Sequence, residues 1–236
     1  MHWDLLEDPA RPGAENMARD LALAEAAGSG LRPPVLRLYG WDPPAVSIGR
    51  NQRPAAACDP DACAAEGWDV VRRPTGGRAV LHGRDEVTYA VALPLALAPE
   101  GVTAAYAWIG QALAAAYRRL GVPVDVAEGR RLDQRTGACF DAPAAHELVC
   151  RGRKVAGSAQ VRRDGYLLQH GSLPLHIDAD LHARLLGLPA GAAGLLRDRA
   201  AGVADLDPAI TAHDLRAAVV EGFRQALGAR FEKRAG

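Results

Sequence analysis

The sequence predicts an α+β fold in which a mixed, largely antiparallel sheet is flanked by helices. Short runs typical of strands, rich in β-branched and other apolar residues, occur in groups separated by tight turns. Longer segments with apolar residues at helical spacing stand before, between and after these groups. Because strands and helices do not alternate one by one, a sheet built from hairpins fits the pattern better than a parallel sheet.

The first half of the chain is predicted to hold one long helix, one short helix and four strands. The long helix covers residues 14–28, because apolar residues recur at helical spacing and Gly28 can end it. Asp59 followed by Pro60 is a typical helix start, and Gly67 can close the short helix. The predicted strands are Val35–Tyr39, Ala45–Ile48, Trp68–Arg73 and Glu86–Leu93.

The second half opens with a predicted helix, Thr103–Leu120, and closes with another that starts at Thr211. Asp214 takes the position that glutamate usually has in a capping box. Between these helices we expect three strands with tight turns and then a shorter helix, namely His146–Cys150, Arg153–Val161, Tyr166–Leu173 and Asp178–Leu186. We expect residues 1–236 to form a single domain, with a helical C-terminal part at about 178–236.

The composition is that of an ordinary globular protein, with 49% apolar and 24% charged residues. A formal net charge of zero gives no reason to expect nucleic acid or a membrane surface as a partner. The apolar runs are too short to span a bilayer, and the N-terminal segment lacks the layout of a signal peptide. Four cysteines in a chain of this length do not make a disulfide framework. We therefore expect a cytoplasmic protein.

The stretch from Ala138 to Leu173 carries the candidate catalytic residues, Cys139 and Lys154. Cys139 lies in a segment without strand or helix signals, and functional side chains concentrate in loops. Lys154 is unusual because 26 of the 28 basic residues are arginines, the other lysine being Lys233. A nearby cation can lower a thiol pKa from about 8.5 to roughly 3.5–7.5. The spacing leaves open whether the two residues meet, and the alternative interpretation of Lys154, an exposed lysine in a turn, is disfavoured by the arginine bias.

The other cysteines and the histidines give weaker signals. Cys58 and Cys63 are better explained as core or surface thiols than as a metal pair, and Cys150 falls in a predicted strand. His146 and His170 leave a cysteine–histidine pair possible. The segment after His146 lacks the second histidine of a zinc-protease helix, so no metal site is predicted.

The segment RRPTGGRAVLH, residues 72–82, is a candidate ligand loop between two strands. Gly76 and Gly77 would allow the backbone to approach a ligand closely, and Arg72 would offer hydrogen-bond donors. A glycine hairpin turn with exposed arginines explains the pattern at least as well. The segment is neither a phosphate-binding loop nor a dinucleotide fingerprint, and His82 alone could be a structural histidine.

The predicted strand Arg153–Val161 places Lys154 and Ser158 on one face, because side chains alternate along a strand. Such a face could line a ligand site, or it could face solvent at a sheet edge. Between residues 130 and 164 there are eight basic and four acidic residues, a local excess of four that would attract an acidic partner.

Together these segments resemble the lipoate–biotin protein ligase superfamily. RRPTGGRAVLH resembles its substrate-binding loop, and KVAGSAQ (154–160) resembles its lysine strand. ACFDAPAAHEL (138–148), followed by KVAGSAQ and LLQHGSL (167–173), is most similar to the branch of cysteine-dependent octanoyltransferases. The likeness begins at PGAENMARDLAL (12–23), continues through YGWDPPAVSIG (39–49) and fades after about Leu175. It implies the catalytic-domain fold of the biotin and lipoate ligases.

The resemblance also implies an acyl-enzyme mechanism without a cofactor or metal. Cys139 would take octanoyl from octanoyl-acyl carrier protein as a thioester, and a lysine of a lipoyl-domain protein, such as the glycine-cleavage H protein, would then receive it. Lys154 would lower the thiol pKa and assist proton transfer. The residues expected to line the acyl tunnel or the carbonyl site are Arg72, Gly76, Gly77, His82, Gly157, Ser158 and His170.

Three alternatives remain open at this point. An ATP-dependent lipoate–protein ligase would share the lysine strand, but Arg78 stands where those ligases usually carry a third glycine, and no asparagine follows His82 closely. An amidotransferase that moves octanoyl between lipoyl-domain proteins would also use a cysteine. A non-catalytic binder of lipoylated or biotinylated domains fits least well, because Cys139 and Lys154 are both present.

Overall fold

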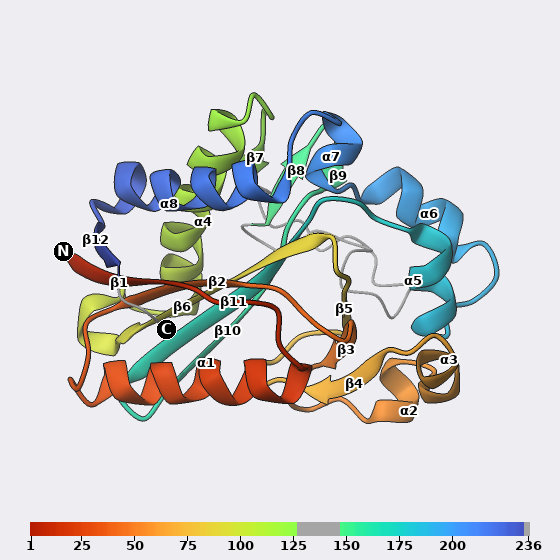
Figure 1. Ribbon diagram of the computed structural model, residues 1–236, viewed down its shortest axis with the longest axis horizontal. Coiled ribbons are helices and arrows are strands. Elements are labelled where there is room, and N and C mark those ends of the chain that lie inside the picture. The colour runs from red at the N-terminus through yellow and green to blue at the C-terminus, as the bar shows by residue number, and fades with distance from the viewer. Residues whose placement is uncertain (127–146, 234–236) are drawn as a thin grey trace.

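A six-stranded sheet forms the centre of the computed structural model, which describes residues 1–126 and 147–233 (Figure 1). The first three neighbouring strand pairs in the sheet order are antiparallel, and the last two are parallel. The predicted α+β class with a mixed sheet is therefore confirmed. In sheet order the strands are β10 (Gly157–Arg163), β11 (Tyr166–Pro174), β6 (Glu86–Pro94), β2 (Val35–Tyr39), β1 (His2–Glu7) and β12 (Arg230–Lys233).

Helices cover both faces of this sheet (Figure 1). The helix α1 (Gly13–Gly28) lies along one face, and α4 (Val102–Arg119) and α8 (Ala212–Leu227) lie against the other. The central strands β6 and β11 are consequently buried along almost their whole length. Within the described ranges, no helix is both long and apolar enough to cross a membrane.

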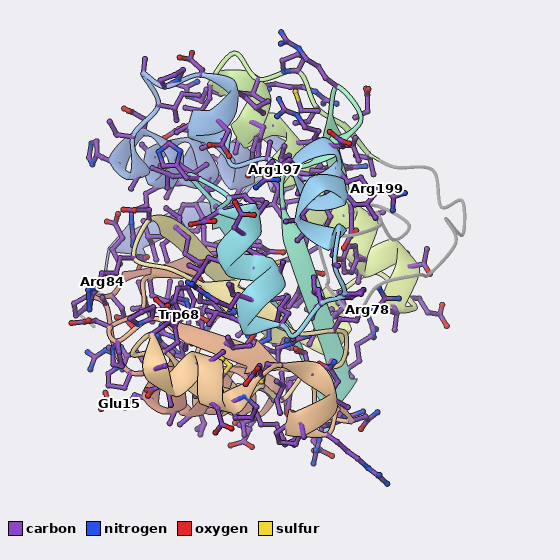
Figure 2. The ribbon with its side chains drawn as sticks, turned by 90° about the vertical axis from the view of Figure 1, so that its right-hand side faces the viewer. Glu15, Trp68, Arg78, Arg84, Arg197 and Arg199 are labelled. Carbon is purple, nitrogen blue, oxygen red and sulfur yellow. The ribbon has the colours of Figure 1, made fainter. Side chains whose placement is uncertain are left out.

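A smaller sheet lies beside one end of the large one and is covered by short helices. Its strand β3 (Ala45–Ile48) is the middle strand, parallel to β4 (Asp69–Arg72) and antiparallel to β5 (Val80–His82). The helices α2 (Pro54–Ala57), α3 (Pro60–Ala65), α5 (Ala179–Leu185) and α6 (Ala192–Arg199) lie on this side of the molecule, which faces the viewer in Figure 2. The remaining described elements are a 3-10 turn at Leu95–Leu97, the helix α7 (Val203–Leu206) and a third sheet of β7 (Asp125–Val126), β8 (Leu148–Cys150) and β9 (Arg153–Lys154).

Local sequence signals set several of these boundaries. The Asp59 side chain caps α3 by accepting hydrogen bonds from two backbone N–H groups of its first turn, at 3.0 and 3.1 Å. Thr211 and Asp214 form the predicted capping box of α8, and Gly228 ends that helix with φ of 61°. Asp164 and Gly165, with φ of 49° and 82°, make the tight turn between β10 and β11. These boundaries were predictable because the contacts that fix them are local.

The prediction of one continuous strand from Arg153 to Val161 is wrong. Strand β9 ends at Lys154 and pairs with β8, whereas β10 starts at Gly157 and belongs to the large sheet. The two residues between them, Val155 and Ala156, are buried in the core under α4, where the Tyr117 hydroxyl donates to the Val155 carbonyl at 2.8 Å. Lys154 and Ser158 therefore do not share a face of one strand.

Strands β1 and β12 were not predicted. In β1, four successive residues from Trp3 to Leu6 are buried, so the strand lacks the alternation that marks one solvent-exposed face. Asp4 is one of them, and its carboxylate accepts from Arg32 at 2.7 Å. Strand β12 joins the sheet only by pairing with β1 at the other end of the chain, a long-range contact that no local pattern reports.

The close approach of α8 to α4 yields a stability prediction. A Cβ atom at Gly222 of α8 would lie 2.2 Å from the Ala112 carbonyl oxygen of α4, so Gly222→Ala should force the helices apart. Although alanine favours helix by about 1 kcal/mol, we expect the variant to unfold at lower denaturant concentration, with a loss of about 1–3 kcal/mol. The control is Gly194→Ala in α6, where a Cβ meets nothing within 4 Å. Equal unfolding midpoints for the two variants would contradict the predicted clash.

Candidate active site

A cavity lies where the large sheet meets the smaller one. Its lining includes residues from β10 and β11 of the large sheet, and residues from β3, β5 and the segment between β4 and β5. The cavity contains about 400 Å³ of space free of protein atoms, part of it open to solvent.

Five of the seven residues expected at the acyl tunnel or carbonyl site line this cavity, although they come from distant parts of the chain. The structure brings together Gly77, His82, Gly157, Ser158 and His170. That these residues bind substrate stays a prediction.

The other two expected residues, Arg72 and Gly76, are not among the described residues that line the cavity. The Arg72 guanidinium is directed to the backbone, where its Nη1 lies 2.8–3.1 Å from the carbonyl oxygens of Gly49, Arg50 and Gln52. Arg72 therefore braces the chain that follows β3. Gly76 contributes a carbonyl group to the side chain of the next arginine along, Arg73.

Arg73 occupies the cavity wall and was not singled out from the sequence. Its side chain donates from Nη1 to the Ser47 carbonyl and hydroxyl at 2.8 and 3.1 Å. Its Nη2 donates to the carbonyls of Gly76 and Arg78 at 2.7 and 2.6 Å, and its Nε also reaches Gly76. Arg73, which is 4% exposed, thus shapes the loop that presents Gly77, where φ is 91°. Figure 2 shows Arg78 on the side of the molecule that carries α5 and α6.

His82 is held between a hydroxyl and a carboxylate. Its Nε2 lies 2.8 Å from Ser47 Oγ, and its Nδ1 lies 2.8 Å from Glu86 Oε1. The ring stacks on Trp41 with a centroid distance of 4.0 Å. Glu86 also accepts a hydrogen bond from Ser172 at 2.8 Å. Since a carboxylate only accepts, Nδ1 carries a proton that it donates to Glu86.

His170 has a similar arrangement. Its Nε2 lies 2.8 Å from Thr75 Oγ1, and its Nδ1 lies 2.9 Å from Asp20 Oδ2. Burial lowers the pKa of His170 below its ordinary value, the Asp20 carboxylate opposes this shift, and the Arg73 charge adds to it. The ring is therefore neutral at neutral pH.

Lys154 is almost completely buried at the end of β9, with an exposed fraction of 1%. Its Nζ donates to Glu147 Oε1 at 2.7 Å, and the Glu147 side chain is also buried. A buried charge is tolerated when an opposite charge compensates it. Lys154 itself is not among the described lining residues, but Gly157, three positions later, lines the cavity.

Cys139, the expected nucleophile, lies outside the described residues. The described cysteines, Cys58, Cys63 and Cys150, are all buried and free. Burial raises the pKa of the Cys58 thiol and raises that of Cys63 to about 12. In the described part of the chain, no three His, Cys, Asp or Glu side chains are grouped as they would be around a metal ion.

Four polar residues that shape the site were missed from the sequence, namely Ser47, Arg73, Thr75 and Glu86. Each lies in or beside a predicted strand and is buried. Ser47 and Glu86 give only the local signal of a polar residue in a run that otherwise looks buried, whereas Arg73 and Thr75 lie in the segment 72–82 that was predicted as a ligand loop.

The chain is similar to known proteins over most of its length. The family described as the lipoyl protein ligase A/B catalytic domain matches residues 12–224. The octanoyltransferase LipM of Symbiobacterium thermophilum is 50% identical over 196 residues, which cover 80% of this chain and 71% of that protein. The octanoyltransferase LipM of Kyrpidia tusciae is 42% identical over 247 aligned residues, covering 98% of this chain and 89% of the relative. From its similarity to these relatives we conclude that the chain is an enzyme, an acyltransferase of the octanoyltransferase type.

Solved structures extend the likeness to the whole fold. A lipoate-protein ligase A bound with ATP superposes with a TM-score of 0.81 at 26% identity, covering 100% of this chain and 90% of that one. The biotin protein ligase from Aquifex aeolicus in complex with biotin and ATP, at 9% identity and a TM-score of 0.52, shares the fold alone, with 96% of this chain and 70% of that chain covered. The predicted ligase-type catalytic fold is confirmed, and the chain belongs to the lipoyl protein ligase A/B catalytic-domain family.

Proposed function

We propose that the chain takes octanoyl from octanoyl-acyl carrier protein and passes it to a lysine of a lipoyl-domain protein in lipoate biosynthesis, through a thioester on Cys139. The acceptor that we propose is the glycine-cleavage H protein. The observation that carries the proposal is a cavity whose polar side chains are already hydrogen-bonded within the protein, in a chain whose relatives are octanoyltransferases.

The hydrogen-bonding groups of the cavity wall have partners within the protein. Both ring nitrogens of His82 and of His170 are engaged. The Ser158 hydroxyl lies 2.7 Å from the Tyr89 hydroxyl, and the Ser172 hydroxyl donates to Glu86. A ligand that needs hydrogen bonds would therefore gain little binding free energy from these side chains. A saturated acyl chain needs none, and its burial is worth about 0.8 kcal/mol per CH₂.

In the first step, the Cys139 thiol loses its proton and its sulfur attacks the thioester carbonyl of the octanoyl donor. The bond to the carrier thiol breaks, that thiol takes up a proton, and octanoyl stays on Cys139. In the second step, the acceptor lysine amine attacks this new thioester, the amine loses a proton, and the Cys139 sulfur leaves and regains one. Covalent catalysis of this kind splits one transfer into two easier steps.

Two observations support the roles given to Cys139 and Lys154. Cys58 and Cys63 are poor nucleophiles because burial holds their thiols protonated. Lys154 is a buried ammonium fixed by Glu147 at 2.7 Å, in a segment that resembles the family's lysine strand. A lysine can stabilise a thiolate and also give or take a proton, which an arginine cannot readily do.

The first prediction concerns the acyl-enzyme. Incubation with octanoyl-acyl carrier protein in the absence of ATP should add one octanoyl group to the protein, detected by intact-mass measurement and removed by hydroxylamine. Cys139→Ala should lose the adduct, whereas Cys150→Ala, which alters a buried core thiol, should keep it. Transfer that requires ATP and free acid would favour the ligase alternative. An adduct donated by octanoylated H protein, with none from the carrier protein, would favour the amidotransferase.

The second prediction concerns Lys154. Lys154→Arg keeps the positive charge but cannot easily release a proton, so we expect the rate of acyl transfer to fall by about 10²-fold or more. The matched control is Arg153→Lys, an exchange between the same two residue types at the neighbouring position of β9, which should keep near wild-type rates. Circular dichroism of both variants checks that they fold. Wild-type turnover in Lys154→Arg would reduce the role of Lys154 to its charge.

A further inference from the structure

We propose that Asp20 is a positioning residue of this site, which acts through His170 on Thr75 and so holds the Arg73–Arg78 loop in place at the cavity. The inference rests on the proposed function in one respect, namely that the cavity holds the acyl chain. Asp20 lies on α1, 55 positions before Thr75 and 150 before His170, and belongs to no catalytic motif of the sequence.

Asp20 is fully buried, and both of its carboxylate oxygens accept hydrogen bonds. Oδ1 accepts from Arg37 Nη1 at 2.7 Å, and Oδ2 accepts from the Tyr39 hydroxyl at 2.8 Å. Oδ2 is also 2.9 Å from His170 Nδ1. Because a carboxylate cannot donate, the proton of the neutral His170 ring is on Nδ1. The other nitrogen, Nε2, is left as an acceptor for the Thr75 hydroxyl at 2.8 Å.

The bond from Thr75 to His170 differs from the other contacts of the loop in what it connects. The Thr75 carbonyl accepts from the backbone N–H of Arg50 at 2.8 Å, and Arg73 bonds within the loop and to β3. These contacts tie the loop to the smaller sheet. The bond to His170 instead joins the loop to β11 in the large sheet. It therefore fixes the spacing between the wall that carries Gly77 and the wall that carries His170.

An asparagine at position 20 has nearly the same size as aspartate but would disturb the hydrogen bonds from Asp20 through His170 to Thr75. Its amide oxygen can still accept from Arg37, but its NH₂ group would then face His170 Nδ1 and donate to it. The neutral ring would respond by carrying its proton on Nε2, and Thr75 would have to accept where it now donates. A buried hydrogen bond with the wrong polarity costs about 1–3 kcal/mol, which corresponds to a factor of about 5 to 150 in binding.

The experiment compares Asp20→Asn with Asp8→Asn. Asp8 is a second buried carboxylate on the same guanidinium, since it accepts from Arg37 Nε at 2.6 Å and from Arg19 at 2.6 Å. No described contact joins it to His170. Each variant is examined by ¹⁵N NMR of labelled histidine rings and by single-turnover acylation over a range of octanoyl-acyl carrier protein concentrations.

In wild type and in Asp8→Asn, we expect the His170 proton on Nδ1 and the same half-saturating donor concentration. In Asp20→Asn, we expect the proton on Nε2 and a half-saturating concentration about 10- to 100-fold higher. A His170 ring with its proton on Nε2 in wild type would overturn the proposal. So would an Asp20→Asn enzyme whose donor dependence matches that of Asp8→Asn.

A second pair of variants decides the matter if Asp20→Asn fails to fold. Thr75→Val removes the hydroxyl that bonds to His170 and should raise the half-saturating donor concentration. Thr75→Ser keeps a hydroxyl at this position and should have the wild-type half-saturating concentration. Equal values for the two variants would overturn the proposal. The NMR measurement needs no substrate, so an absence of acyl-enzyme in wild type would count against the proposed function and leave the test of Asp20 intact.

Discussion

The pairing of Arg37 with two carboxylates is the interaction on which the packing of α1 against the large sheet depends. Arg37 is fully buried between α1 and the large sheet, and Asp8 and Asp20 accept from it at 2.6 and 2.7 Å. Removing one partner of such a buried pair typically costs about 3–5 kcal/mol. The Arg37 and Arg19 charges hold the pKa of Asp8 below its usual value despite its burial. The stabilisation from Asp8 is therefore present at neutral pH and is lost as the pH falls through this lowered pKa.

Much of the fold was predictable because local chemistry fixes it. Strands β2 and β3 have the predicted limits, and the caps at Asp59 and Thr211 start the helices that they were expected to start. The errors occur where distant contacts override the local pattern. Alternation continues through Val155, yet burial under α4 and pairing of β9 with β8 end the strand there. Likewise, β1 and β12 exist because the two ends of the chain pair with each other.

The segments that form the candidate site were predictable from the sequence, but the side-chain contacts between those segments were not. Resemblance to a known family pointed to the loop that holds Gly77 and His82 and to the strand that holds His170, and the structure brings these residues to one cavity. Pattern alone did not distinguish Arg72, which braces a turn, from Arg73, which lines the cavity. Asp20 is separated from His170 by 150 positions, and no periodicity in one sequence reports such a contact.

The way Arg73 is bonded bears on the choice between a thioester and an adenylate. A guanidinium has five N–H donors, and those of Arg73 are directed to the carbonyl of Gly76, the carbonyl and hydroxyl of Ser47, and the carbonyl of Arg78. An arginine committed in this way has no donor to offer a phosphate without breaking the loop that it holds. The positively charged side chain of Arg73 therefore stabilises the cavity wall through these hydrogen bonds. A site so arranged favours a ligand recognised by shape and apolar contact, as we propose for the octanoyl chain.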